Sequence, residues 1–510
     1  MSAAPLPASS TVAVIGAGAM GSGIAQIAAV AGHPVKLLDA REGAATSAIE
    51  GIRTQLNKLA DKGRLTPEAA QAAGERLSVA TQVSELADAA LIVEAIIEDL
   101  AAKQSLFVSL ESIVSDDAIL STNTSSISIT AIGAALKRPE RLAGLHFFNP
   151  APLMPLVEIV SGIDTDTSVA DTLFATAKAW GKTPVHARST PGFIVNRIAR
   201  PYYAEALRLL QEGAADVATI DAVMREAGGF RMGPFELMDL IGHDVNFAVT
   251  RSVWTAFFND TRFTPSLIQQ ELLEGGFLGR KSGRGFYDYR EGATKLLAAT
   301  QAPRSLNTTV TLHGTSEAAT AFATRLSNAN IALTSGATTA DGRIATVGDA
   351  VIFVTDGRSA TQRASQSNIA NTVLIDLALD YASTTRIVIS CAQQCAPAAC
   401  DNAIAMLQAA GLQVSLMKDI PGLAVMRTVA MLANEAADAV NQGVCSAADV
   451  DAAMRLGVNY PRGPLAWAEE IGVTTVRDVL FNLAQSYGED RYRISPRIQQ
   501  ACYAGGSLHD

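Results

Sequence analysis

The residues best suited to proton transfer lie in one short stretch, GLHFFNPAPLMPLVEIV, at positions 144–160. It holds His146, one of only six histidines in the chain, and Glu158, an acid set among valine and isoleucine. Histidine titrates near neutral pH, and a carboxylate on its far nitrogen fixes the tautomer and stabilises the charged ring. The stretch therefore predicts a base and its carboxylate partner. The alternatives are a packed core histidine and, because an unpaired buried acid is costly, an ion pair of Glu158 with Arg197 or Lys103.

The elements that must position this pair are strands of one sheet. AGLHFF and LVEIV are short apolar runs that each predict a strand, and AILSTNTSS predicts a strand that opens into a polar loop containing Ser125. DAALIVEAI predicts another buried strand, with Glu94 and Glu98 near its carboxyl end. Ligands of open α/β sheets bind at that end of the strands. We interpret Glu94 as a structural acid.

The amino-terminal segment TVAVIGAGAMGSGIAQIAAVAGHPVKLLD predicts a dinucleotide site. A buried strand leads into GxGxxG, formed by Gly16, Gly18 and Gly21, and a helix and a second strand ending in Asp39 follow. The first two glycines allow a tight turn and close approach to a pyrophosphate, and the third allows close helix–strand packing. Asp39 would accept both ribose hydroxyls, which favours NAD over NADP, although the nearby Arg41 could accept a 2′-phosphate.

The second half of the chain repeats part of the first with a shift of 230 residues. STPGFIVNRIARPYYAEALRLLQEG at 189–213 aligns with DIPGLAVMRTVAMLANEAADAVNQG at 419–443 without a gap, which indicates duplication of a small helical domain. The aligned pairs are Pro191 and Pro421, Arg197 and Arg427, Glu205 and Glu435, Asp221 and Asp451, and Gly233-Pro234 and Gly463-Pro464. Under the same shift His146 falls on Asp376, Glu158 on Val388 and Asn196 on Met426. We therefore expect the second half to be structural and to supply the surface that a second subunit would otherwise supply.

Composition narrows the class of protein. A length of 510 residues, at about 150 residues per domain, predicts three or four domains. The apolar content of 48% is high enough for these domains to form hydrophobic cores. A net charge of −10 argues against nucleic acid as a partner. The start of the chain does not resemble a signal peptide and no run is long enough to span a membrane, so we expect a cytoplasmic protein. Its five cysteines favour a reducing compartment, and their spacing does not predict a metal site.

Taken together, these motifs resemble the 3-hydroxyacyl-CoA dehydrogenase family. The resemblance covers residues 11–289 and resumes in the helical repeat, and it is carried by seven motifs: VIGAGAMGSGIAQIAA, IVEAIIEDLAAK, STNTSSISI, LHFFNPAPLMPLVEIV, TPGFIVNRI, GGFRMGPFELMDLIG and GRKSGRGFYDY. The repeated helical domain and the degenerate middle segment are similar to the long form of this family that acts on 3-hydroxyadipyl-CoA in bacterial phenylacetate degradation. The resemblance implies an NAD-dependent enzyme that oxidises an L-3-hydroxyacyl-CoA.

The resemblance also implies roles for individual residues. His146 would be the base and Glu158 its partner, with Ser125 and Asn196 polarising the substrate oxygen. The implied NAD contacts are Gly16, Gly18, Met20, Gly21, Asp39, Glu98, Lys103, Ser125, Asn149 and Lys281. The implied contacts to the acyl-CoA substrate are Lys62, Ser125, Asn149 and Asn196. A serine that some members carry near Lys62 is Gln55 here, which puts the CoA contact in doubt.

The expected fold is α/β plus all-α. A Rossmann-type NAD-binding domain at 8–188 is followed by a helical domain at 189–295, a degenerate α/β segment at 300–418 and a second helical domain at 419–510. The chain would be a monomer with an internal pseudo-dimer, or a homo-oligomer.

The acyl chain is the main open question at this stage. The alternative to the adipyl substrate is 3-hydroxybutyryl-CoA, in short-chain fatty acid or hydroxybutyrate metabolism, and the two differ in whether a cation meets a distal carboxylate. Arg200, Arg231 and Arg280 are candidates for that cation. An alternative of another class is a non-catalytic NAD-binding protein.

Overall fold

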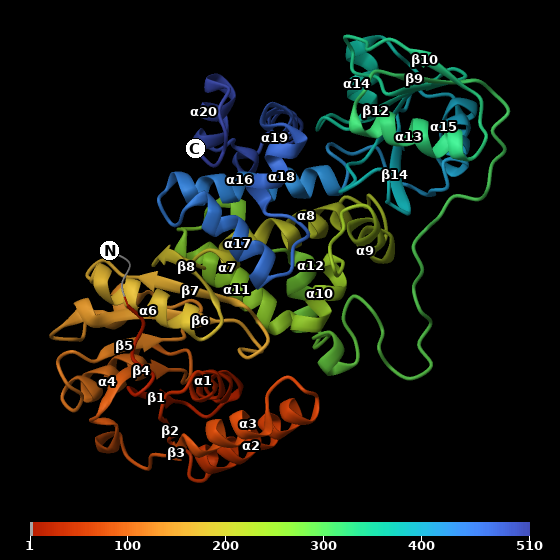
Figure 1. Cartoon of the computed structure of the whole chain (residues 1–510). Helices are drawn as coiled ribbons and strands as arrows, with labels where there is room; N and C mark the ends of the chain where they lie inside the picture. Colours follow the sequence, from red (N-terminus) through yellow and green to blue (C-terminus); the bar gives the residue numbers. More distant parts are fainter. Residues whose placement is uncertain (1–3) are drawn as a thin grey trace. The chain divides into compact units, whose positions relative to one another are not determined.

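A computed structural model describes residues 4–510 of the chain and divides them into two compact units (Figure 1). Unit 1 comprises the chain up to Arg197 together with Gln442–Val458. Unit 2 comprises Ile198–Asn441 and Asn459–Asp510. Unit 1 therefore includes residues 442–458, a piece of the expected second helical domain.

Unit 1 is built on an eight-stranded sheet in the order β3-β2-β1-β4-β5-β6-β7-β8. All neighbouring strands are parallel except β6 and β7, which are antiparallel. The strands are β1 (Thr11–Ile15), β2 (Val35–Leu38), β3 (Leu77–Val79), β4 (Ala89–Glu94), β5 (Ile119–Thr122), β6 (Leu142–Phe147), β7 (Leu156–Ser161) and β8 (Thr183–Arg188). The order reverses between β1 and β4, which is where a Rossmann-type sheet binds its ligand. The fold class predicted from the sequence is confirmed here.

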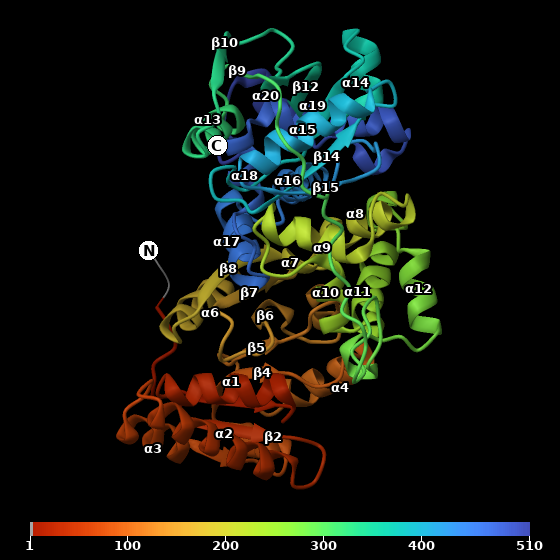
Figure 2. The same ribbon diagram turned by 90° about the vertical axis from the view of Figure 1, so that its right-hand side faces the viewer.

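Helices cover this sheet and leave its apolar strands buried. They are α1 (Ala19–Val30), α2 (Ala44–Asp61), α3 (Pro67–Glu75), α4 (Leu100–Glu111), α5 (Ile129–Gly133), α6 (Thr167–Ala179) and α7 (Val195–Ile198), with short 3-10 turns at Val83–Leu86 and Pro139–Arg141. The first three pack against one another, as Figure 2 shows. Their apolar faces share one core with β1 and β2.

One helix of the second copy belongs to unit 1. Helix α17 (Ala447–Gly457), blue in Figure 1, packs against β7 and β8 although it lies some 260 residues later in the chain. The backbone N–H of Arg188 at the end of β8 donates to the carbonyl of Val444, 2.8 Å away. A Cβ on Gly457 would contact the side chains of Leu156 and Val195, so a larger residue would not fit there. The second copy therefore covers the strand that carries Glu158.

The helices of unit 2 come from both copies of the helical domain. The first copy supplies α8 (Arg200–Gln211), α9 (Val217–Glu226), α10 (Pro234–Ile241), α11 (His243–Ala256) and α12 (Leu267–Glu274), with 3-10 turns η3 (Thr261–Phe263) and η4 (Arg280–Ser282). The second supplies α16 (Val425–Asn441), α18 (Pro464–Ile471), α19 (Val473–Tyr487), η5 (Asp490–Tyr492) and α20 (Pro496–Ala504). Where α16 is continuous, the first copy breaks into α7 and α8, because Pro201 has no N–H to donate and its counterpart is Met431.

The two copies meet through buried charge as well as apolar contact. Helices α8 and α16 pack together, and Nε of Arg427 from the second copy donates to Glu205 of the first at 2.6 Å. Both side chains are buried, and the hydroxyl of Tyr492 also donates to Glu205 at 2.9 Å. A buried ion pair of this kind is costly to break, because the remaining charge has no partner. The duplication thus places one half of the pair in each copy.

The segment between the copies is a reduced Rossmann-type sheet in the order β10-β9-β11-β12-β13-β14-β15. Its elements are β9 (Val310–His313), α13 (Glu317–Asn328), β10 (Leu333–Gly336), β11 (Ala345–Val347), β12 (Ala350–Val354), α14 (Ala360–Ser367), β13 (Thr372–Ile375), β14 (Arg386–Cys391), α15 (Pro397–Ala409) and β15 (Gln413–Leu416). β14 and α15 repeat the bounds of β7 and α6 with the shift of 230 residues. The antiparallel β13–β14 and parallel β14–β15 pairs repeat β6–β7 and β7–β8.

In the second half of the chain, Asp376 binds the backbone N–H groups at the start of a helix, as Glu158 does in the first half. Its carboxylate accepts the backbone N–H groups of Ala424, Val425 and Met426 at 2.8–3.0 Å, and that of Leu377 at 2.8 Å. The side chain is fully buried at the start of α16. In the first half, the carboxylate that accepts the N–H groups at the helix start is that of Glu158 on β7. In the second half it is that of Asp376, the residue aligned with His146.

Replacing Asp376 with asparagine is expected to lower the thermal stability of the chain and to flatten its pH dependence. Burial raises the pKa of Asp376 from 3.8 to about 6. Because the folded pKa lies above the ordinary one, the contribution of this group is full below the ordinary pKa and is lost as the pH rises through 6. The amide would also leave two N–H groups unpaired, at about 1–3 kcal/mol each.

Thermal midpoints between pH 4 and 8 measure both effects. The control is Asp349→Asn, an exposed acid of the same segment, and equal pH slopes in Asp376→Asn and wild type would contradict the prediction.

Two of the late cysteines form a disulfide that the sequence did not predict. Cys391 at the end of β14 is bonded to Cys400 in α15, and Cys395, Cys445 and Cys502 are free.

Among residues 4–510 there is no group of three or more His, Cys, Asp or Glu side chains that could hold a metal ion. Within the same residues, every helix is too short or too polar to cross a membrane.

Candidate active site

His146 and Glu158 face each other directly across two strands. The antiparallel register of β6 and β7 pairs the two residues, and Nδ1 of His146 lies 2.6 Å from Oε2 of Glu158. Both side chains are almost completely buried. Of the described residues, none hydrogen-bonds to Nε2 of His146, so this nitrogen is the one left for a substrate. The alternative ion pair between Glu158 and Lys103 is not formed, because Lys103 pairs with Glu94 at 2.6 Å instead.

The second oxygen of Glu158 fixes the start of the next helix. Oε1 accepts the backbone N–H groups of Ile194 and Val195, both at 3.0 Å. Negative charge at a helix amino terminus is stabilised by the unpaired N–H groups there. One carboxylate therefore orients the histidine and anchors the segment that carries Asn196, the residue after Val195.

Aromatic side chains hold the imidazole in place. The ring of Phe148 lies 4.6 Å from that of His146, and the ring of Phe193 lies 5.8 Å away, edge to face. The backbone N–H of Phe147 donates to Oδ1 of Asn123, which directly follows the neighbouring strand β5, at 2.8 Å. Packing of this kind restricts the motion of the imidazole ring and keeps water away from the His146–Glu158 hydrogen bond. The exclusion of water strengthens this bond. Asn123 was missed from the sequence, and its only signal was its place just after a strand.

The glycine motif has the geometry that a dinucleotide requires. Gly16 turns the chain with a φ of 106°, which a side chain would strain. A Cβ on Gly21 would overlap the carbonyl oxygen of Gly16, whereas one on Gly18 would meet nothing within 4 Å. Helix α1 begins after Gly18 without a side-chain cap, so its first N–H groups can bind a phosphate. These residues fit the pyrophosphate of NAD.

Asp39 lies at the end of β2, beside the glycine loop. Its carboxylate accepts the N–H of Ala17 at 2.7 Å and bonds to the backbone and side chain of Arg41 at 2.9 and 3.1 Å. The hydrogen bonds from Arg41 lower the pKa of Asp39 to about 2, so it is ionised at neutral pH. Arg41 is 73% exposed and can move aside. The place of Asp39 agrees with a ribose contact, and that contact stays a prediction.

Glu98 organises the loop that carries Ser125. One of its oxygens accepts the hydroxyl of Thr124 at 2.6 Å and the backbone N–H groups of Ser125 and Ser126 at 3.0 and 3.1 Å. Burial works against ionisation, but the Thr124 bond and the nearby Lys103 outweigh it and lower the pKa of Glu98. Among described residues the Ser125 hydroxyl has no partner, so it is available to a ligand. Thr124 was missed because no sequence signal links it to an acid so far away.

Four further residues predicted to bind NAD or substrate lie in four separate places. Met20 is half-buried on α1, and Asn149 is exposed before Pro150. Lys62 is exposed at the carboxyl end of α2. Lys281 belongs to unit 2, where its amine pairs with Asp244 at 2.5 Å. Their contacts to NAD or CoA stay predictions.

An apolar groove of about 870 Å³ runs along unit 1 between α1 and α2. Ile27 and Val30 of α1 and Ile52 of α2 line it, and Gln55 and Arg64 add polar groups. It extends to Pro150, four residues beyond His146. No acidic side chain within the described residues lines it, so it suits a long ligand with an anionic end.

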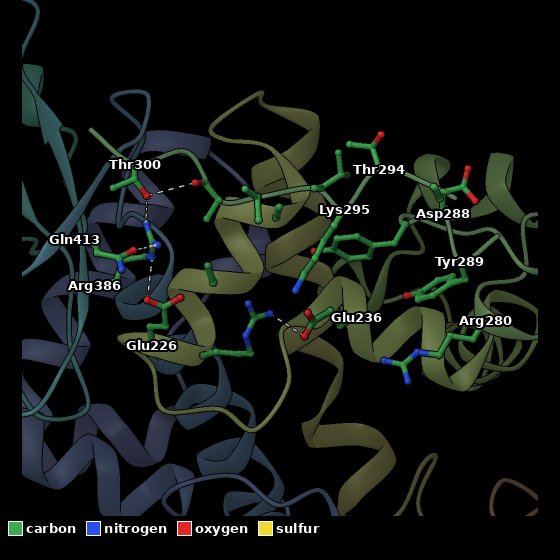
Figure 3. Close-up of a pocket in the computed structure, with 18 residues that line it drawn as sticks. Glu226, Glu236, Arg280, Asp288, Tyr289, Thr294, Lys295, Thr300, Arg386 and Gln413 are labelled. Carbon is green, nitrogen blue, oxygen red and sulfur yellow. Dashed lines mark hydrogen bonds and ion pairs between the residues drawn. The ribbon is translucent and has the colours of Figure 1, made fainter. Parts of the chain in front are cut away.

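A pocket of about 590 Å³ in unit 2, drawn in Figure 3, contains two ion pairs. The figure shows Glu236 bonded to an arginine, which is Arg225 at 2.8 Å, and Arg386 bonded to Glu226 at 3.2 Å. Arg280, a candidate for a distal carboxylate, lies over the ring of Tyr289 at the side of this pocket. The lining of this pocket does not include His146, Glu158, Ser125 or Asn196, so it is not the predicted active site.

Comparison with known proteins agrees with this geometry. The NAD binding domain of 3-hydroxyacyl-CoA dehydrogenase matches residues 11–190, and the C-terminal domain of the same family matches residues 192–289 and 422–507. The reduced Rossmann-fold domain of 3-hydroxybutyryl-CoA dehydrogenase matches residues 352–421. The chain belongs to the 3-hydroxyacyl-CoA dehydrogenase family. It is an NAD-dependent dehydrogenase, and the predicted enzyme class and cofactor are confirmed.

Two relatives cover nearly the whole dehydrogenase. A protein of Escherichia coli named 3-hydroxyadipyl-CoA dehydrogenase is 45% identical over 96% of this chain and 97% of its own length. The crystal structure of an E. coli protein described as 3-hydroxybutyryl-CoA dehydrogenase is 44% identical, covers 97% of this chain and 98% of its own, and has a TM-score of 0.88. A 3-hydroxybutyryl-CoA dehydrogenase of Clostridioides difficile is 40% identical over 55% of this chain and 99% of its own length.

Proposed function

We propose that this dehydrogenase oxidises L-3-hydroxyadipyl-CoA to the 3-oxo thioester. The observation that carries the proposal is the 45% identity, over almost the full length of both chains, to a protein named for that substrate. The full-length structural relative is named for the butyryl substrate, so 3-hydroxybutyryl-CoA is the second candidate. Either substrate requires the same proton transfer.

The His146–Glu158 pair supports the proposed mechanism. Nε2 of His146 takes the proton of the substrate hydroxyl, while Nδ1–H donates to Glu158, which stabilises the charged ring. NAD, when bound, supplies the acceptor for the hydride that leaves carbon 3. The hydroxyl of Ser125 and the amide of Asn196 polarise the substrate oxygen as its charge changes.

The apolar groove between α1 and α2 supports an acyl-CoA ligand. Pantetheine is long and largely apolar, and its nucleotide end carries phosphates. The groove offers apolar residues along its length and Arg64 with Gln55 among its lining. We propose that CoA lies there, with Lys62 near its phosphates and the thioester directed to His146.

Turnover of a substrate panel tests the choice of acyl chain. L-3-hydroxyadipyl-CoA, hexanoyl and butyryl analogues are compared by NADH formation at 340 nm, with NAD and NADP in parallel. We expect the highest kcat/KM for the adipyl chain with NAD, because only this chain has a distal carboxylate, and a cation paired with it would add about 1.5–3 kcal/mol, or ten- to a hundredfold. A higher kcat/KM for the butyryl chain would select the second candidate, and no turnover of any chain would favour a non-catalytic NAD-binding protein.

A further inference from the structure

A second, smaller pocket in unit 2 differs from that of Figure 3 in its charge. It measures about 230 Å³ and lies between α8, the turn before α12 and η5. Three arginines line it, Arg200, Arg208 and Arg491, and within the described part of the chain no aspartate or glutamate does. A pocket of this size holds one small ion or acid rather than a cofactor.

The arginines reach the pocket from both copies of the helical domain. Arg200 and Arg208 both belong to α8, and both line the pocket. Arg491 comes from η5 of the second copy. Arg200 also donates to the hydroxyl of Thr250 at 3.0 Å, which holds its guanidinium at the pocket wall. Both copies of the helical domain therefore contribute cations to this pocket.

The charge of Arg491 is only partly balanced by nearby acids. Its side chain is 8% exposed, and its nearest carboxylates, on Glu205 and Glu489, are both 3.8 Å away. Each of these acids makes a shorter bond elsewhere, Glu205 to Arg427 at 2.6 Å and Glu489 to Arg208 at 2.9 Å. Nε of Arg491 is buried and has no hydrogen-bond partner in residues 4–510. A buried donor without a partner is costly, so a ligand that accepts from it would be stabilising.

The amino terminus of α12 faces the same pocket. Ser266 is the residue before the helix and lines the pocket, but its side chain does not cap the helix. Its buried hydroxyl oxygen, like Nε of Arg491, has no partner among the described residues. The first N–H groups of a helix carry partial positive charge and favour an anion. A hydroxyl, a helix terminus and three guanidinium groups thus surround one space.

We propose that this pocket binds a small oxyanion, either phosphate or the carboxylate of a small organic acid. The anion accepts from Nε of Arg491 and from the hydroxyl of Ser266, and the guanidinium groups of Arg200 and Arg208, which line the same pocket, attract it. Because these groups come from both copies, the bound anion stabilises the internal pseudo-dimer. All of these groups belong to unit 2, whereas His146, Glu158, Ser125 and Asn196 belong to unit 1.

Titration calorimetry of the whole enzyme tests the proposal with inorganic phosphate and succinate as probes, against chloride at equal ionic strength. We expect binding of one ion per chain and a rise in the thermal midpoint that chloride does not reproduce. Arg491→Lys keeps the charge but removes Nε–H and should weaken the affinity about tenfold. Ser266→Ala should weaken it less and is the milder variant if the first folds poorly.

Two controls separate this site from other anion sites. Arg477→Lys changes an arginine of the same copy that pairs with Asp478 and lies outside the pocket, so its affinity should equal that of wild type. A saturating acyl-CoA should leave anion binding unchanged. Equal affinity in Arg491→Lys, Ser266→Ala and wild type, or displacement of the anion by acyl-CoA, would overturn the proposal. Tighter binding of phosphate than of succinate, or the reverse, identifies the ligand class.

Discussion

Replacing His146 with glutamine is expected to lower kcat by about 10²–10⁴-fold, the usual contribution of a general base. Glutamine cannot take up the proton that leaves the substrate hydroxyl. Its amide can still donate to Glu158, so the carboxylate keeps a partner and the strands keep their contact. The Kd for NAD should not change, because the glycine loop and Asp39 are untouched. Initial rates of NADH formation and fluorescence titration with NAD measure the two effects.

The matched control for this change is His186→Gln in the same unit. His186 lies 3.8 Å from Asp171, and both side chains are nearly half exposed. It is therefore a histidine near a carboxylate that has no place in the site, and its replacement should leave turnover intact. Turnover of His146→Gln at the wild-type rate would contradict the proposed base. A parallel loss of NAD binding would show that the residue supports the fold instead.

Replacing Glu158 with glutamine is expected to reduce kcat on the same scale, about 10²–10⁴-fold, by reversing the histidine tautomer. The amide oxygen can still accept from Ile194 and Val195, so the amide nitrogen must face His146. Nδ1 would then accept a hydrogen bond and Nε2 would carry the proton. A protonated Nε2 cannot act as the base, although the geometry is almost unchanged.

The readouts for Glu158→Gln separate catalysis from stability. Thermal unfolding should remain close to that of wild type, because both backbone bonds at the helix start are kept. Glu94→Gln is the matched control, since Glu94 is equally buried but pairs with Lys103 and Thr122. We expect that control to lose stability and to keep more of its kcat. A Glu158→Gln enzyme with full kcat would rule out the orienting role.

The sequence predicted most of the local geometry of the site. His146 and Glu158 each lie in a short apolar run, and two such runs joined by a proline-rich turn pair as neighbouring strands. The glycine motif was equally clear, because each glycine has a separate steric reason for its place. Neither prediction needed knowledge of distant contacts. The fold class followed from the same local patterns together with the repeat.

The features that the sequence did not predict depend on contacts between distant segments. Helix α17 is amphipathic like its counterpart in the first copy, so nothing in its own pattern assigned it to the sheet of unit 1. Asp376 was recognised as the loss of a histidine, but its four bonds to backbone N–H groups required the fold. The binding of Thr124 by Glu98 and the pairing of Cys391 with Cys400 also depend on how loops are placed.

The protonation of the two ring nitrogens of His146 tests the central claim most directly. Nitrogen-15 NMR of the enzyme with labelled histidine, at neutral pH and without substrate, separates a protonated nitrogen from an unprotonated one. His146→Gln assigns the signals among the six histidines. The predicted spectrum has a proton on Nδ1, held by Glu158, and none on Nε2. A proton on Nε2 with a bare Nδ1 would contradict the account, because the base would then be unable to accept the substrate proton.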